Sequence, residues 1–344
     1  MTHPAILAID GGNSKADVAV IDAGGQLLAA VRGPTISHQA VGLEEATRRL
    51  TALVHGVRAD AGLAPEGAPP WQSAVACLAG ADYPEDVRRL RAAFGPIARS
   101  GSGDTLILND TFAVLRAGAS RPWGIALICG QGINAAAVTV GGRRIRFAGV
   151  GDIAGDWGGA GGVGMAGLAA AVRGQDGRGP RTALERTIPA AVGRRRPDAV
   201  THAYYAGRLD EARIGELAPT VFATAIDGDA IARAIVDRLA VELAGMAAAL
   251  ARRAGLVRRD PEVVFGGSVF RTHDAAFHDR LHDGIVAAIP GARVVRLATP
   301  PVAGAALIGL DALAPSGAAD PEVAHRLRAA LEAWSATAAV VTAS

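Results

Sequence analysis

The chain has 344 residues, with 35 Lys plus Arg, 33 Asp plus Glu, a net charge of +2 and only 4% aromatic residues. Charges of both signs are dispersed, and no basic stripe is interleaved with aromatic side chains, which argues against a nucleic-acid partner. The longest uncharged segment, residues 124–142, contains polar residues and several glycines, so we expect no membrane span.

The two cysteines, Cys77 and Cys129, lie 52 residues apart, without CxxC spacing and without a signal peptide in the sequence. This pattern predicts buried, reduced thiols and a cytoplasmic location. A single hydrophobic core stops growing near about 250–300 residues, so a chain of this length predicts two domains.

Strands and helices alternate in the first part of the chain. The apolar run that ends at Asp10 predicts a buried strand, and a second strand then leads to a hairpin turn at residues 23–25. Further strands are predicted at residues 26–32, 73–78 and 105–108, and helices at residues 42–59, after Pro84 and from Thr111. The loops between them are expected at residues 33–38, 64–70 and 79–82. This order predicts an α/β domain.

The pattern then restarts. Residues 125–138 align without a gap on the opening strand–turn–strand, with Cys129 opposite Asp10, and residues 141–142 and 143–147 supply a second hairpin turn and third strand. The restart predicts a second, similar domain at the length where a second core is needed. Only the first copy retains an acid, so we expect metal binding in the first half alone.

Glycine and helical segments dominate the rest of the chain. A glycine-rich loop is expected at residues 149–164, and the arginines of residues 173–196 are interpreted as a solvated surface. Helices are predicted at residues 163–172, within 197–255, and at 275–289, 302–313 and 321–334, with strands near 263–265 and 293–297 and a loose tail at the end. The long helix at residues 229–254 carries an apolar stripe of Ile231, Ile235, Leu239, Leu243, Met246 and Leu250.

The turn after Asp10 has the chemistry of an anion site. Its backbone N–H groups, a hydroxyl and an ammonium suit a nucleotide phosphate, and Asp10 at the strand end suits Mg²⁺. Lys15 is the only lysine among the 35 cations, and it lies in this turn. Asp110 follows another buried strand, where it would either accept a proton or cap the helix that begins at Thr111.

Five segments together resemble the sugar-kinase, Hsp70 and actin superfamily of ATPases, and most of all the N-acetylglucosamine kinase branch grouped with the BadF/BadG/BcrA/BcrD-type ATPases. They are residues 10–15, 108–110, 129–132, 149–156 and 266–269. The resemblance covers nearly the whole chain. It implies two ribonuclease H-like (actin-like ATPase) domains with an interdomain cleft: residues 1–118, completed by a C-terminal helix at about 302–344, and residues 119–301 with a helical insertion.

The resemblance also implies a role for each matching residue. Asp110 would be the catalytic base, and Asp10 would position Mg²⁺. ATP would be held by Gly11, Gly12, Asn13, Ser14, Lys15, Gly130, Gln131, Gly132, Gly266, Gly267 and Ser268. The sugar would contact Ser37, His38, Asn109, Asp110, Gly149, Val150, Gly151 and Asp156. In this family Thr and Ser usually stand at positions 131 and 133, and an acid stands where this chain has Trp157, which would either stack on the sugar or anchor the loop in the core.

The function that the resemblance implies is an ATP- and magnesium-dependent kinase for the 6-hydroxyl of an amino sugar, most of all N-acetylglucosamine. Glucosamine and N-acetylmuramic acid are alternative substrates, and a homodimer is compatible with the resemblance. An alternative of a different class is the ATP-driven activator subunit of a dehydratase or reductase, whose iron–sulfur cluster takes two cysteines from each subunit; Cys77 and Cys129 are poorly placed for that. A sugar-sensing regulator is disfavoured, since no helix-turn-helix segment precedes the first motif.

Overall fold

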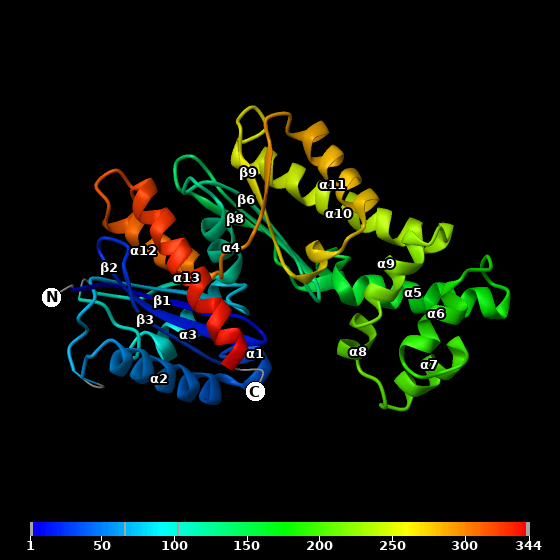
Figure 1. Ribbon diagram of the computed structural model, residues 1–344, viewed down its shortest axis with the longest axis horizontal. Coiled ribbons are helices and arrows are strands. Elements are labelled where there is room, and N and C mark those ends of the chain that lie inside the picture. The colour runs from blue at the N-terminus through cyan, green and yellow to red at the C-terminus, as the bar shows by residue number, and fades with distance from the viewer. Residues whose placement is uncertain (1–2, 65–66, 102, 342–344) are drawn as a thin grey trace. The chain divides into compact units, whose positions relative to one another are not determined.

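The computed structural model describes residues 3–64, 67–101 and 103–341 (Figure 1). The strands are β1 Pro4–Gly11, β2 Lys15–Asp22, β3 Leu27–Pro34, β4 Ser73–Leu78, β5 Leu106–Asn109, β6 Gly124–Cys129, β7 Ile133–Val138, β8 Arg144–Arg146, β9 Glu262–Gly266 and β10 Arg293–Arg296. The helices are α1 His38–Val41, α2 Leu43–Asp60, α3 Pro84–Phe94, α4 Asp110–Gly118, α5 Gly159–Asp176, α6 Leu184–Ala191, α7 Pro197–Tyr205, α8 Glu211–Gly215, α9 Ala218–Ile226, α10 Ala230–Ala254, α11 Ala275–Ala288, α12 Val302–Leu313 and α13 Pro321–Val341. Two 3₁₀ turns span Gly151–Ala154 and Ser268–Arg271.

Residue contacts divide the chain into two compact units. Unit 1 consists of residues 1–126, 136–144 and 295–344, and unit 2 of residues 127–135 and 145–294. The expected second domain is therefore present as a compact unit, whereas the boundaries at residues 118 and 301 stay a prediction. The expected C-terminal segment also includes residues 342–344, which lie outside the described residues.

The first sheet has the strand order β3-β2-β1-β4-β5. Successive side chains of a strand point to opposite faces, and β1 is apolar on both. Leu7 and Ile9 belong to a core shared with α2 and α3, while Ile6 faces α12, where a Cβ on Gly309 would come within 2.8 Å of it. Both faces of β1 are thus covered by helices, which explains its nearly continuous apolar sequence.

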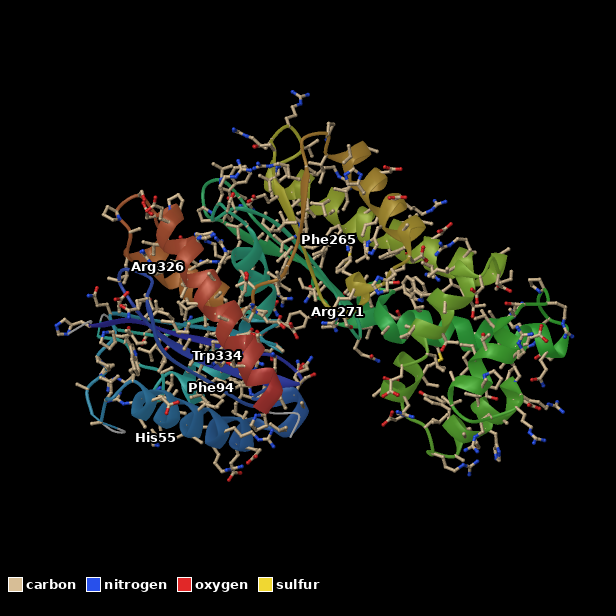
Figure 2. All side chains as sticks on the ribbon, viewed as in Figure 1. His55, Phe94, Phe265, Arg271, Arg326 and Trp334 are labelled. Carbon is tan, nitrogen blue, oxygen red and sulfur yellow. The ribbon has the colours of Figure 1, made fainter. Side chains whose placement is uncertain are left out.

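Helices from the end of the chain complete unit 1. α12 packs on β1, β4 and α4, and α13 packs on β3; Figure 1 shows both helices, in orange and red, beside the blue strands. Trp334 of α13, labelled in Figure 2, has its ring centroid 5.0 Å from the Arg32 guanidinium of β3. Ser335 accepts a hydrogen bond from the same guanidinium at 3.0 Å.

The second sheet repeats the topology of the first. Its order is β10-β9-β6-β7-β8, so that β6, β7 and β8 correspond to β1, β2 and β3, and β9 and β10 to β4 and β5. The order confirms the restart inferred from the sequence. α10 packs against α11, α9 and α5, and α5 in turn packs against α6, α7 and α8.

Several element limits differ from the predictions. α5 begins at Gly159, four residues before the expected start, because its glycines let the helix end lie directly on the turn at residues 130–132: a Cβ on Gly159 would fall 2.4 Å from the Gln131 carbonyl oxygen. A short helix, α1, lies at the end of the expected loop 33–38, and α6 lies within the arginine-rich stretch. α13 continues to Val341 through part of the expected tail.

The apolar stripe predicted on α10 is only partly buried. Leu239, Leu243 and Leu250 are buried, whereas Ile231 and Ile235 line a surface cavity. The thiols of Cys77 and Cys129 are both free and buried, as predicted. Among the described residues, no helix has the length and apolar character required to cross a bilayer.

Candidate functional site

Asp10 and Asp110 lie at the same edge of the first sheet. β1, β4 and β5 run parallel, with Asp10 in register with Cys77 and Leu78 in register with Asn109. The carboxyl ends of these strands therefore meet at one edge, and Asp110 follows directly as the first residue of α4. The two carboxylates are close enough for the charge of Asp110 to raise the pKa of Asp10.

The pKa of the Asp10 carboxyl lies well above its ordinary value of 3.8. Burial is the largest cause, followed by the charges of Asp17 and Asp110, while Lys15 and Arg32 act in the opposite direction. Since the folded chain favours the protonated carboxyl, the stability that Asp10 contributes is present below pH 3.8 and is lost as the pH rises through the raised pKa. A bound cation would reverse this preference.

Asp17 is the fixed neighbour of Asp10. It lies directly opposite Asp10 on β2 and is fully buried. Arg32 on the adjacent strand donates to both of its carboxylate oxygens, at 2.7 and 2.9 Å. Lys15 Nζ lies 3.7 Å from the same carboxylate and remains about half exposed. A cationic pair thus partly balances a group of three acids, Asp10, Asp17 and Asp110.

The coordination chemistry of magnesium limits which of these three acids suits the ion. Mg²⁺ usually takes one or two protein carboxylates and fills its other positions with waters and phosphate oxygens. In the described part of the chain no group of three or more His, Cys, Asp or Glu is arranged as a metal cage. Asp10, whose ionised form needs a further positive charge, is therefore the side chain best suited to hold such an ion.

Part of the backbone of the turn at residues 11–15, called the first turn below, is hydrogen-bonded within the turn itself. The Gly12 N–H donates to the Lys15 carbonyl at 3.0 Å, closing the hairpin. Asn13 and Ser14 at the tip are exposed. Gly11 is required by packing, because a Cβ there would meet Ile36 and Leu78 at 2.8 Å. The groups that this turn can offer to a phosphate are those of Asn13, Ser14 and Lys15.

Thr35 connects the first turn to the predicted sugar residues. Its hydroxyl donates to the Gly12 carbonyl at 2.7 Å and accepts from the Ser37 N–H at 3.0 Å. Ser37 Oγ and His38 Nδ1 are buried and have no hydrogen-bond partner among the described residues. Two predicted sugar contacts are thus held near the turn with unused polar atoms. No sequence pattern had marked Thr35.

Asn109, and not Asp110, caps α4. The Asn109 side-chain oxygen accepts from the Thr111 N–H at 3.1 Å and from the Thr111 hydroxyl at 2.7 Å. The capping role considered for Asp110 therefore belongs to its neighbour. Asp110 is half-buried in the first turn of α4.

In unit 2, the turn at residues 130–132 lies against the beginning of α5. The Ala160 and Gly161 N–H groups donate to the carbonyls of Gly130 and Gln131, both at 2.8 Å. A Cβ on Gly130 or Gly132 would meet nothing within 4 Å, so there is open space over the turn. The Gln131 side chain turns toward α8, and its amide donates to the Glu211 carbonyl at 3.3 Å.

A cavity of about 600 Å³ in unit 2 begins beside this turn. Gln131 and Ala160 line one part of it, Phe222 and Ile226 of α9 form an apolar part, and Ser268 and its neighbours close it. Arg271, labelled in Figure 2, and His273 are polar groups in its lining. Of this lining, the sequence motifs identified only Gln131 and Ser268 as site residues. The lining residues of α8 and α9 belong to the helical insertion, which carries no motif.

Residue 267 is a glycine because the neighbouring backbone leaves no room for a Cβ atom. It has φ +108°, and a Cβ would fall 2.3 Å from the Cys129 carbonyl oxygen. The family resemblance assigns this glycine to ATP binding, and the close approach of β9 to the end of β6 by itself explains why residue 267 is a glycine. Gly266 is buried and Ser268 exposed.

The glycine-rich segment after β8 holds Asp156. The backbone N–H groups of Val150 and Gly149 donate to its carboxylate, yet burial raises the pKa of Asp156 above its ordinary value. One carboxylate oxygen is buried and has no partner among the described residues. Gly149, Val150 and Asp156 are thus together, as expected, and Gly151 accepts from the Asp156 N–H at 3.2 Å.

Trp157 anchors this segment to the helices. The Arg238 guanidinium stacks on its ring at 3.7 Å from the centroid, and the ring lines a cavity between α5 and α10. Of the two roles considered for Trp157, the contacts favour the anchoring one. The arginine-rich stretch behaves as a solvated surface: Arg178, Arg181 and Arg196 are 62–84% exposed and form ion pairs with nearby acids.

The structure therefore groups the predicted residues in two sets. Unit 1 brings together Asp10, the first turn, Ser37, His38, Asn109 and Asp110. In unit 2, residues 130–132 lie beside the cavity that Ser268 lines. A separate group in the same unit consists of Gly149, Val150, Gly151 and Asp156.

Comparisons with known proteins agree with this architecture. The N-acetyl-D-glucosamine kinase of Dictyostelium discoideum is 24% identical over 319 residues, which are 90% of this chain and 99% of that protein. The N-acetylmuramic acid/N-acetylglucosamine kinase of Clostridium acetobutylicum is 27% identical over 241 residues, 69% of this chain and 76% of that protein. The structure of a candidate N-acetylglucosamine kinase from Chromobacterium violaceum superposes with a TM-score of 0.67 at 19% identity, covering 90% of this chain and 99% of the other.

The structural likeness confirms the expected fold class, the two-domain ribonuclease H-like fold of the actin-like ATPases. A sequence profile of the BadF/BadG/BcrA/BcrD ATPase family matches residues 7–309. Because that match spans most of the chain, the protein belongs to the BadF/BadG/BcrA/BcrD ATPase family.

Proposed function

We propose that the protein is an ATP-dependent sugar kinase that phosphorylates the 6-hydroxyl of an amino sugar, with N-acetylglucosamine as its substrate. The observation that carries the proposal is the electrostatic contact of Asp10 with Asp110 at the carboxyl edge of the first sheet, beside the glycine turn. The kinase names of two sequence relatives support the reaction class.

Phosphoryl transfer requires little covalent chemistry from a protein and depends on positioning and on charge stabilisation. Asp10 would hold Mg²⁺, which neutralises charge on the phosphates when it is bound. Asn13, Ser14 and Lys15 would contact the phosphates from the first turn. Gly132 has open space over it and would supply a backbone donor, whereas the Gly130 N–H already donates to the Gly132 carbonyl at 3.0 Å.

Asp110 would orient the sugar hydroxyl and accept its proton as the new bond to phosphorus forms. Ser37, His38, Asn109 and Asp156 are the proposed sugar contacts. A carboxylate can accept from two sugar hydroxyls at once, and the unused buried oxygen of Asp156 suits that role. The apolar cavity beside Ser268 would take the adenosine part of ATP, with Arg271 and His273 at its rim.

Glucosamine and N-acetylmuramic acid remain alternative substrates for the same site residues. The name of the Clostridium acetobutylicum relative includes N-acetylmuramic acid as well as N-acetylglucosamine. The activator-subunit alternative gains no support, because Cys77 and Cys129 are each fully buried inside strands. An exposed pair of thiolates would be needed to share a cluster with a second subunit.

An assay of ADP release coupled to NADH oxidation tests the proposal. It would compare glucosamine, N-acetylglucosamine, N-acetylmuramic acid, N-acetylmannosamine and glucose, each with MgATP and with ATP plus EDTA. We expect the highest kcat/KM with N-acetylglucosamine, no turnover with EDTA, and phosphorus on carbon 6 by NMR. ADP release that no sugar stimulates would refute the kinase function, and iron bound to the purified protein would favour the activator.

A further inference from the structure

Asp82, in the polar turn between β4 and α3, contacts two segments that carry predicted site residues. Its carboxylate accepts a hydrogen bond from the Asn109 side-chain nitrogen at 3.0 Å. Its other oxygen lies 3.4 Å from the side-chain nitrogen of Gln39 in α1. One carboxylate therefore links the segment that contains Ser37 and His38 to the segment that contains Asp110.

The bond to Asp82 fixes which way the Asn109 amide points. The Asn109 oxygen faces Thr111 and caps α4, so the nitrogen must find an acceptor on the opposite side. Asp82 is that acceptor. Asn109 is buried, and losing the acceptor would leave its N–H groups without compensation or turn the amide away from Thr111. The second change removes the cap at the start of α4, where Asp110 lies.

The turn that carries Asp82 is also packed tightly on α1. Gly80 has φ +79°, and a Cβ there would lie 2.9 Å from both Gln39 Cδ and His38 Cε1. His38 is in turn 3.8 Å from Asp86 through Nε2, while its Nδ1 and Ser37 Oγ are buried with no partner among the described residues. Unused buried polar atoms therefore lie on the α1 side of Asp82, where they are available to a polar ligand.

We propose that Asp82 is a positioning residue of the acceptor site: it holds the Asn109 amide, and through it fixes Asp110 relative to the sugar hydroxyl. This inference rests on the proposed kinase function. Asp82 acts through Asn109, so the nucleotide phosphates at the first turn are unaffected by its loss. Removing it should change the reaction of the sugar and leave the apparent affinity for MgATP unchanged.

Steady-state kinetics of four variants test the proposal. Asp82→Ala removes the acceptor, and Asp82→Asn keeps an uncharged oxygen of the same shape. Asn109→Ser keeps a helix-capping oxygen but is too short to reach Asp82. Glu85→Gln, two-thirds exposed in the first turn of α3, is the matched control for loss of a negative charge.

We expect Asp82→Ala to lower kcat/KM for the sugar by about 10- to 100-fold, since misplacing a catalytic group by about 1 Å has an effect of that size. Asp82→Asn should recover part of the loss. Asn109→Ser should lose at least as much as Asp82→Ala, because Asn109 is also a proposed sugar contact, and the double variant should be no worse than Asn109→Ser. The KM for MgATP should stay within about twofold of the wild-type value, because Asp82 acts on the sugar side and its loss removes no contact with the nucleotide. Losses that multiply in the double variant, or wild-type kinetics for Asp82→Ala, overturn the proposal.

Crystal structures of the wild type and of Asp82→Ala give a readout that does not depend on catalysis. We expect the Asn109 amide to leave Thr111 in the variant, with a shift of the first turn of α4. An unmoved amide overturns the proposal. If the wild type phosphorylates no sugar, the kinase function fails on that result alone, and the crystal structures still decide whether Asp82 positions Asn109 and Asp110.

Discussion

Replacing Arg32 by Met should strongly destabilise unit 1. Asp17 is fully buried, and Arg32, whose side chain is 6% exposed, provides its two short hydrogen bonds. Removing one partner of a buried ion pair leaves an uncompensated charge, which costs about 3–5 kcal/mol. Loss of the stacking on Trp334 adds about 0.5–1 kcal/mol. Lys15 remains 3.7 Å from Asp17 and offsets part of this, so we expect a loss of about 3 kcal/mol.

Urea unfolding, followed by circular dichroism and tryptophan fluorescence at fixed ionic strength, measures the change in the free energy of unfolding. Arg48→Met is the matched control, because Arg48 is 71% exposed and its solvent-screened ion pair with Glu45 should contribute little to stability. The double variant Asp17→Leu/Arg32→Met should recover most of the loss, since replacing a whole buried pair by apolar groups is often nearly neutral. The reasoning would be refuted if Arg32→Met and Arg48→Met lowered the free energy of unfolding equally. A double variant less stable than Arg32→Met would refute it as well.

Three other outcomes are expected. Asp110→Asn should lower kcat by about 10²–10⁴-fold, the range for loss of a general base, while isothermal titration still detects MgATP; turnover near the wild-type rate would contradict the assignment. In EDTA at neutral pH, Asp10→Asn should be more stable than the wild type, because burial opposes the charged carboxyl, and thermal melts should show this advantage fading as the pH falls toward 3.8. Mg²⁺ with ATP should raise the melting temperature of the wild type but not of Asp10→Asn. Gly267→Ala should destabilise by about 1–3 kcal/mol through strain at positive φ, whereas Gly132→Ala, with open space around it, should unfold at the wild-type urea concentration.

The sequence predicted the elements of the sheets well because their signals are local. The apolar run before Asp10, the glycines at the hairpins and the proline at the start of α3 each act within a few residues. The shared strand order of the two sheets also follows from a local signal, the repeat of the strand–turn–strand unit. These features required no knowledge of the tertiary structure.

The remaining features depend on contacts between distant segments. Asn109 rather than Asp110 caps α4, and the nitrogen of its amide donates to Asp82, 27 positions earlier. The start of α5 at Gly159 depends on the backbone of residues 130–132, which accepts its first N–H groups. The lining of the large cavity comes from helices of the insertion, where apolar periodicity indicates burial but not which face meets a cavity.

The contact of α13 with Arg32 has a consequence for folding during synthesis. Ser335 hydrogen-bonds a guanidinium 303 positions earlier in the chain, so the first sheet emerges from the ribosome long before the helix that steadies its buried arginine. Contacts of such large sequence separation form late and slow the folding rate. Unit 2 ends at residue 294, whereas unit 1 includes residues 295–344, so unit 1 can complete its contacts only after all of unit 2 has been synthesised.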